Sequence, residues 1–159
     1  MNKLRRFRRL AAPERASLLW AFVLVPATGA ALRVVGLQRW KTLLRWTLPR
    51  ESSIRANLSE AEKSTAIDFA KRTGRMVAAA AREGLYHGRC LEQSVTLWWL
   101  LARRKLPAEL HIGVRKADAG IEAHAWVELF GTVVNDSDGV RQDFVPFGRD
   151  IASLRSEPQ

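Results

Sequence analysis

The spacing of apolar residues changes once along the chain, at Pro107. Before this proline, apolar residues recur every three or four positions, which is typical of helices that bury one face. In residues 108–129 they alternate with polar residues, which is typical of strands with one buried face. The order predicts an α+β fold: N-terminal helices, then a cysteine-bearing helix packed on a three- to four-stranded antiparallel sheet.

The most regular helical pattern begins at the single cysteine of the chain, Cys90. Cys90, Ser94, Leu97 and Leu101 follow one another at intervals of four, three and four residues, so they share one face of a helix. Pro107 prevents this helix from continuing. We therefore predict a helix whose first turn holds the cysteine and whose apolar face meets the sheet.

Two helices are expected in the first fifty residues. Pro13 next to Glu14 suits a first helical turn, where a missing N–H costs nothing and an acid meets the positive end of the helix. Pro26 predicts a break. We expect one helix from about 13 to 25 and a second from about 29 to 48.

Two local motifs mark where other elements begin or turn. Ser59 and Glu62 form a capping box, in which each residue satisfies a backbone donor of the other, so a helix is expected to follow Ser59. Phe130 and Gly131 separate two alternating stretches, so a tight turn between antiparallel strands is expected there.

Basic residues are concentrated at the N-terminus. Residues 1–50 contain eleven Lys and Arg and one acidic residue, Glu14, which accounts for the whole formal net charge of +10. The chain of 159 residues is long enough for one domain with a real core. We therefore divide it into a basic helical segment, 1–50, and a core, 51–159, within one domain overall. Such a segment suits an anionic membrane surface, an acidic partner or nucleic acid, and a solvated helix face is the plainer interpretation.

The N-terminal segment also resembles a targeting signal. Residues 16–32 carry no charge and follow a basic start, as in a secretory signal. Glu14 and Arg15 interrupt that pattern, and the run is short for a membrane span. We expect helices packed on the domain or resting on a membrane surface, with a cleaved signal and a true span as alternatives. The single cysteine allows no disulfide within the chain, which favours a cytoplasmic location. Together with the N-terminal helices, this predicts a cytoplasmic protein that can associate with a membrane.

Three residues in order along the chain suggest cysteine chemistry: Cys90 at a helix start, His124 in a strand and Asp136 at the end of the next strand. A helix N-terminus and an imidazolium both favour the thiolate, which is the nucleophile. A histidine can return the proton to a leaving group, and a carboxylate can hold its other ring nitrogen.

Each of these residues also has a simpler interpretation. A lone cysteine in a helix is commonly a packed small hydrophobe, a histidine in a strand is commonly structural, and an aspartate after Val-Val-Asn is commonly a turn former. Metal binding would need paired ligand spacing, and the histidines, Cys90 and Asp136 do not have it. We expect no metal and no cofactor.

The ordered set resembles a known family. "GRCLEQSVTLWWLLARRKLPAELHIGV", "EAHAWVEL" and "VVND" are similar to the transglutaminase-like superfamily of cysteine enzymes, and within it to the leader peptidases of lasso-peptide biosynthesis. The resemblance implies a papain-like core in 51–159, with Cys90 as nucleophile, His124 as base and Asp136 as the acid that orients it. Where the family commonly has a glycine after the cysteine helix, this chain has Lys105.

The resemblance also implies a function and partners. The expected enzyme is a cysteine peptidase that removes the leader peptide from a ribosomally made lasso-peptide precursor through a thioester. The expected partners are the precursor, a separate leader-recognition protein and an asparagine-synthetase-like lasso cyclase, with membrane contact through residues 1–50 and no nucleic acid. The Cys90 backbone N–H is the expected oxyanion donor. Tyr86 is a candidate second donor, and Tyr86 and Trp126 are candidates for the substrate groove.

Two alternatives stay open. A transglutaminase-like acyltransferase would form the same thioester and pass the acyl group to an amine instead of water. A non-catalytic basic adaptor that binds membrane or nucleic acid would need only the charge of residues 1–50.

Overall fold

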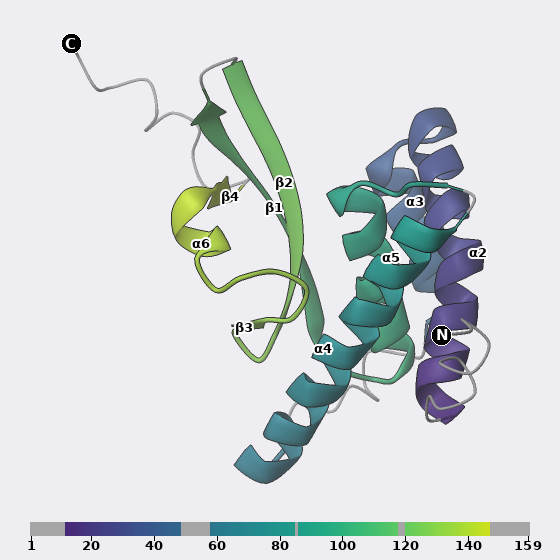
Figure 1. The fold of residues 1–159 in the computed structure, drawn as a ribbon, viewed down its shortest axis with the longest axis vertical. Helices are drawn as coiled ribbons and strands as arrows, with labels where there is room; N and C mark the ends of the chain where they lie inside the picture. Colours follow the sequence, from purple (N-terminus) through teal and green to yellow (C-terminus); the bar gives the residue numbers. More distant parts are fainter. Residues whose placement is uncertain (1–11, 49–57, 85, 118–119, 147–159) are drawn as a thin grey trace.

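A computed structural model describes residues 12–48, 58–84, 86–117 and 120–146. Its elements, in chain order, are α2 (Ala12–Val34), α3 (Leu37–Trp46), α4 (Glu60–Glu83), α5 (Cys90–Arg103), β1 (Ala108–Ala117), β2 (Gly120–Leu129), β3 (Thr132–Val133), α6 (Val140–Asp143) and β4 (Val145–Pro146). The helices form one layer beside the sheet, and α6 lies on the opposite side of the sheet (Figure 1). The predicted α+β fold, with a cysteine-bearing helix followed by an antiparallel sheet, is confirmed.

The sheet has four antiparallel strands in the order β3-β2-β1-β4. Phe130 and Gly131 form the predicted turn between β2 and β3, with φ angles of 49° and 71°. Two positive φ angles are typical of the two-residue hairpin turns that match the twist of the strands. β4 returns to the opposite edge and pairs with the middle of β1, so the segment after β3 crosses one face of the sheet.

The predicted break at Pro26 is wrong. α2 continues through Pro26, and the chain breaks at Gly36, whose φ is 78°. A proline inside a helix removes one hydrogen bond. Here both halves of α2 bury a stripe against the domain, including Val25 before the proline and Thr28 after it, and this burial outweighs the lost bond. α3 then ends at Trp46, two residues earlier than expected.

α4 begins at the predicted capping box. Glu62 N donates to Ser59 Oγ at 3.4 Å, and Ser59 N donates to Glu62 Oε2 at 2.9 Å. Near the middle of α4, a Cβ added at Gly74 would lie 3.0 Å from the Val134 carbonyl oxygen. The glycine therefore lets α4 approach the segment that follows β3.

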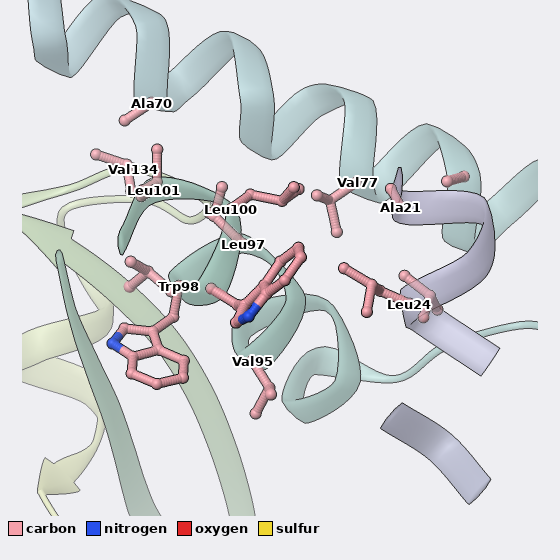
Figure 2. Close-up of a cluster of buried hydrophobic side chains, with 14 of the residues drawn as sticks. Ala21, Leu24, Ala70, Val77, Val95, Leu97, Trp98, Leu100, Leu101 and Val134 are labelled. Atoms are coloured by element: carbon pink, nitrogen blue, oxygen red, sulfur yellow. The ribbon is translucent and has the colours of Figure 1, made fainter. Parts of the chain in front are cut away.

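α5 is the central helix of the core. Its residues from Ser94 to Leu101 are all buried, because α2 and α4 cover one side and the sheet covers the other. Figure 2 shows the cluster where side chains of three helices meet, among them Leu24 of α2, Val77 of α4 and Leu97 of α5.

α5 ends in a left-handed cap. Lys105 has a φ of 62°, its N–H donates to the Ala102 carbonyl at 2.9 Å, and the Leu106 N–H donates to the Leu101 carbonyl at 3.2 Å. This pair of bonds is the Schellman motif, in which glycine is the usual residue at the left-handed position. Lysine thus adopts the conformation that the family's glycine would adopt more cheaply.

Residues Glu14–Val34 of α2 are long and apolar enough to cross a membrane, with a mean hydropathy of 1.6, and a third of the most apolar part is buried in the domain. Length and composition alone do not separate a membrane helix from a helix packed in a core.

Candidate active site

The cysteine lies where the prediction placed it, at the first residue of α5. The Cys90 thiol is half-buried and free, and the preceding residue, Arg89, makes no side-chain cap. The loop before it is fixed by two hydrogen bonds: Gln93 Nε2 donates to the Gly88 carbonyl at 2.7 Å, and Tyr86 Oη donates to Glu92 Oε1 at 2.9 Å. The thiol therefore stands at the open, electropositive end of a well-anchored helix.

His124 and Asp136 are in direct contact. His124 Nε2 lies 2.5 Å from Asp136 Oδ2, and Asp136 Oδ1 accepts the Ser137 N–H at 2.7 Å. The turn at Phe130–Gly131 brings the two residues together, because it folds the segment after β3 back along β2. Since Nε2 is engaged by the carboxylate, Nδ1 is the ring nitrogen left to exchange a proton with a thiol.

The His124 ring is packed between aromatic side chains. Its centroid lies 5.1 Å from Phe144 and 6.5 Å from Trp126, whose indole is stacked near-parallel to it. A Cβ at Gly113, the residue paired with His124 on β1, would lie 2.8 Å from Phe144 Cβ and 3.0 Å from the Trp126 ring. The glycine therefore leaves the space in which Phe144 and Trp126 hold the imidazole.

A buried polar network joins the cysteine helix to the strand of His124. Ser94 Oγ donates to the Ala125 carbonyl at 2.8 Å and accepts from Asn135 Nδ2 at 3.0 Å. Asn135 Oδ1 accepts the Val127 N–H at 2.8 Å.

This network supplies hydrogen bonds to the part of the β2 edge that the two-residue strand β3 is too short to reach. The backbone N–H and carbonyl of Val127 point toward the edge of β2 that faces β3. There the Val127 carbonyl accepts from Val134 N at 3.0 Å. Backbone groups two residues apart on a strand point the same way, so the Ala125 carbonyl also points out of this edge. β3 has ended there, and Ser94, one helical turn after Cys90, takes its place.

The structure thus brings His124 and Asp136 into contact and fixes the first turns of α5 beside them. In the described part of the chain, the Cys90 thiol makes no hydrogen bond with His124. The connection between them runs through Ser94 and Ala125.

The two candidate groove residues are placed differently from the expectation. Trp126 is 1% exposed and donates from Nε1 to Glu128 Oε1 at 2.9 Å, so its indole supports the His124 ring and offers no free surface to a peptide. The Tyr86 hydroxyl donates a hydrogen bond to Glu92, and the Tyr86 ring lies against α2, where a Cβ at Gly29 would be 2.6 Å from it. Tyr86 therefore holds the loop before Cys90, with its donor already in use.

The sequence reasoning missed three residues around the pair: Ser94 as a link, Asn135 as its partner and Phe144 as a cover. Ser94 gave a signal, as a polar residue on the apolar face one turn after Cys90. Asn135 and Phe144 gave none, because their roles depend on how the segment after β3 crosses the sheet.

A cavity of about 340 Å³ opens beside the candidate acid. One wall is the segment of Val134, Asn135 and Asp136, and the other is α4, which contributes the cations Lys71 and Arg75. The cavity reaches solvent and places positive charge next to the carboxylate side of the candidate site.

A helix that starts at a half-buried cysteine, fastened to a strand whose histidine pairs with an aspartate from the following segment, defines the class of papain-like cysteine enzymes. The sequence model of the transglutaminase-like superfamily matches residues 25–149, so the chain belongs to the transglutaminase-like superfamily. That superfamily includes cysteine proteases and acyltransferases, and this chain is of that kind. No curated protein and no solved structure matches the chain.

Proposed function

We propose that this protein is a cysteine peptidase that removes the leader peptide from a lasso-peptide precursor. The observation that carries the chemistry is the His124–Asp136 contact beside the helix that begins at Cys90. The lasso-peptide substrate is supported by the similarity of the segments around Cys90, His124 and Asp136 to the leader peptidases.

In the proposed reaction, Cys90 Sγ attacks the carbonyl carbon of the last leader residue while its proton passes to His124 Nδ1. The oxyanion of the tetrahedral intermediate lies toward the open N–H groups at the start of α5, and the Cys90 N–H is the minimal donor. Collapse of the intermediate breaks the C–N bond, and the imidazolium gives its proton to the amine of the departing core peptide. The leader remains as a thioester on Cys90.

Water then completes the cycle. His124 takes a proton from water, the hydroxide attacks the thioester carbonyl, and the thiolate leaves and is reprotonated. Asp136 keeps the ring in one orientation and stabilises the imidazolium in both steps. The products are a leader with a free carboxylate and a core with a free amine, which the proposed cyclase partner would use. A separate leader-recognition protein is proposed to deliver the precursor.

The test uses the full-length protein with its recognition partner and precursor peptide, followed by mass spectrometry. Cys90→Ala should lower the rate by about 10⁴-fold or more, and His124→Ala by about 10³-fold. Asp136→Asn should lose less than Cys90→Ala, and Asp138→Asn, which removes a nearby exposed carboxylate outside the pair, should cleave normally. Undiminished cleavage by Cys90→Ala would refute the proposal.

The acyltransferase alternative shares the thioester and differs in the acceptor. Hydroxylamine added to the reaction should trap a leader hydroxamate in either case. Without an added amine, a peptidase releases the free leader acid at its full rate, whereas an acyltransferase releases it only slowly and is accelerated by the amine. An adaptor would leave the precursor intact under both conditions.

A further inference from the structure

α2 is apolar on both sides, which is unusual for a helix on the surface of a soluble domain. Its inward stripe includes Ser17 and Thr28, and Thr28 is fully buried, with its Oγ1 accepting from Trp40 Nε1 at 3.2 Å. Leu19 and Val23, on the outward side, are 57% and 62% exposed. A surface helix normally has charged and polar residues on its outward side.

The exposed apolar side chains are concentrated on two neighbouring helices. Nine large apolar residues in the described part of the chain are well exposed, and seven of them lie on α2 and α3: Leu19, Trp20, Phe22, Val23, Val34, Leu43 and Trp46. Scattered exposed apolar residues are ordinary, but a contiguous set marks a surface that meets a partner or a membrane.

On α2, Leu19, Val23 and Val34 belong to one continuous strip, which we call the outer stripe. At helical spacing it consists of Ala16, Leu19, Val23, Ala27, Ala30 and Val34. Trp20, at its edge, instead packs on Trp99 and Arg103 of α5. No charged residue interrupts the outer stripe, and it runs along nearly the whole helix. At a helical rise of about 1.5 Å per residue, the outer stripe is an apolar surface roughly 27 Å long from Ala16 to Val34. A straight apolar strip of this length suits a flat apolar surface.

α3 adds charge next to the outer stripe. Arg39, Leu43 and Trp46 are spaced four and three residues apart and all are exposed, so a cation, a leucine and a tryptophan share the outer face of α3. From Arg15 to Arg50 the chain contains six cations and no acid. This uniform positive charge complements an anionic surface, and tryptophan with arginine beside an apolar strip is typical of helices that lie at a membrane interface.

We infer that the outer stripe of α2, with the outer face of α3, rests on an anionic membrane surface. The helix lies on the membrane without crossing it, because its other side, with Ala21, Leu24 and Val25, is part of the domain core and would have to leave it. Figure 1 shows α2 on the far side of the helical layer from the sheet, so docking leaves the His124–Asp136 side open to substrate. This inference is independent of the proposed peptidase reaction.

The test measures co-sedimentation of the full-length protein with vesicles. Vesicles of equal parts phosphatidylcholine and phosphatidylglycerol should bind the protein, and vesicles of phosphatidylcholine alone should bind it much more weakly. The double variant Leu19→Gln, Val23→Gln should lose about tenfold or more in partition, since two apolar side chains no longer enter the interface. Arg39→Gln, on the outer face of α3, should lose about fivefold.

The matched control is Ile121→Gln, which removes an even more exposed apolar side chain from the sheet, at 81% exposure, and should bind as the unchanged protein does. Circular dichroism checks that every variant is folded. Release of the bound protein by high salt supports surface docking, whereas release only by detergent would show a crossing helix and overturn it. Equal binding to neutral and anionic vesicles would also overturn the inference. So would the absence of vesicle binding together with a dimer in solution that Val23→Gln dissociates.

Discussion

α2 and α5 are the two most apolar long helices of the described chain, and they occupy opposite situations. α5 is covered on all sides: Leu97 and Leu101 are fully buried, and even its polar Ser94 is bonded inside the core. α2 is covered on one side only, so some of its large apolar residues, such as Leu24, are buried and others, such as Leu19 and Val23, face outward. Composition alone would treat the helices alike, so the difference shows that burial depends on what lies on each side.

The difference extends to function. The buried helix presents its N-terminus, with Cys90, to the strand of His124, and its polar contacts fix that position. The half-covered helix has no role in this geometry beyond packing behind α5 and holding Tyr86. Substitutions in α5 should therefore change stability and chemistry together, and substitutions on the outer stripe should change neither.

The largest effect on stability is expected when one leucine side chain of each helix is shortened to alanine. Leu97→Ala should lower the free energy of unfolding by about 3 kcal/mol, because it leaves a cavity between α5 and α4. Leu19→Ala should change it by less than about 0.5 kcal/mol, because that side chain is mostly in water. Urea denaturation of both variants measures the contrast. Similar losses would mean that the outer stripe is packed against part of the same chain.

The next effect compares the buried hydroxyls of the two helices. Ser94→Ala should cost about 2 kcal/mol, because the Ala125 carbonyl loses its donor and Asn135 Nδ2 loses its acceptor. Thr28→Val should cost about 1 kcal/mol, because only the half-buried Trp40 Nε1 is left unpaired. Only Ser94→Ala should also slow cleavage, measured with the precursor peptide. A normal rate would separate this network from the candidate site.

The elements that could be predicted from the sequence are those with local signals. The start of α5 at Cys90, the capping box at Ser59 and the turn at Phe130 all depend on neighbours within four residues. The contact between His124 and Asp136 follows from that turn, because a two-residue hairpin sets the register of the strands on either side.

The features that sequence reasoning missed depend on residues far apart in the chain. α2 continues through Pro26 because α4 and α5 bury both of its halves, which a local rule about proline does not include. Trp126 is buried on the second face of the sheet because Phe144 returns over it, and the alternating pattern of β2 gave no sign of that cover. The Ser94–Asn135 bond exists only once helix and sheet have met.

The ends of the two helices give a smaller, opposed pair of effects. Gly36 after α2 and Lys105 after α5 both have positive φ angles, 78° and 62°. Lys105 is the left-handed cap of α5, whereas Gly36, with a ψ of 168°, is extended. Lys105→Gly should raise the free energy of unfolding by roughly 0.5–1 kcal/mol, because a side chain no longer strains this conformation. Gly36→Ala should lower it by more, about 1–3 kcal/mol, because a Cβ there meets no other atom but the backbone conformation suits essentially glycine alone. Thermal unfolding of both proteins measures the pair, and shifts of the same sign would contradict it.

The smallest effect is a pH dependence where α3 packs on α5. Burial, and to a lesser degree the charge of Arg45, lower the pKa of Lys41 from its ordinary value of 10.5, and its Nζ lies 5.7 Å from the Trp98 ring centroid. The unfolded chain therefore holds this proton to higher pH than the folded protein does. The stability of the unchanged protein relative to Lys41→Met should rise as pH increases through the lowered pKa toward 10.5, and should level off above it. Arg45→Gln should move this rise to higher pH, because one cause of the lowered pKa is gone. The difference in free energy of unfolding between Lys41→Met and the unchanged protein could instead stay constant from neutral to alkaline pH. That result would mean that Lys41 is as solvated as the outward-facing Arg39, and that α3 covers α5 less closely than the structure shows.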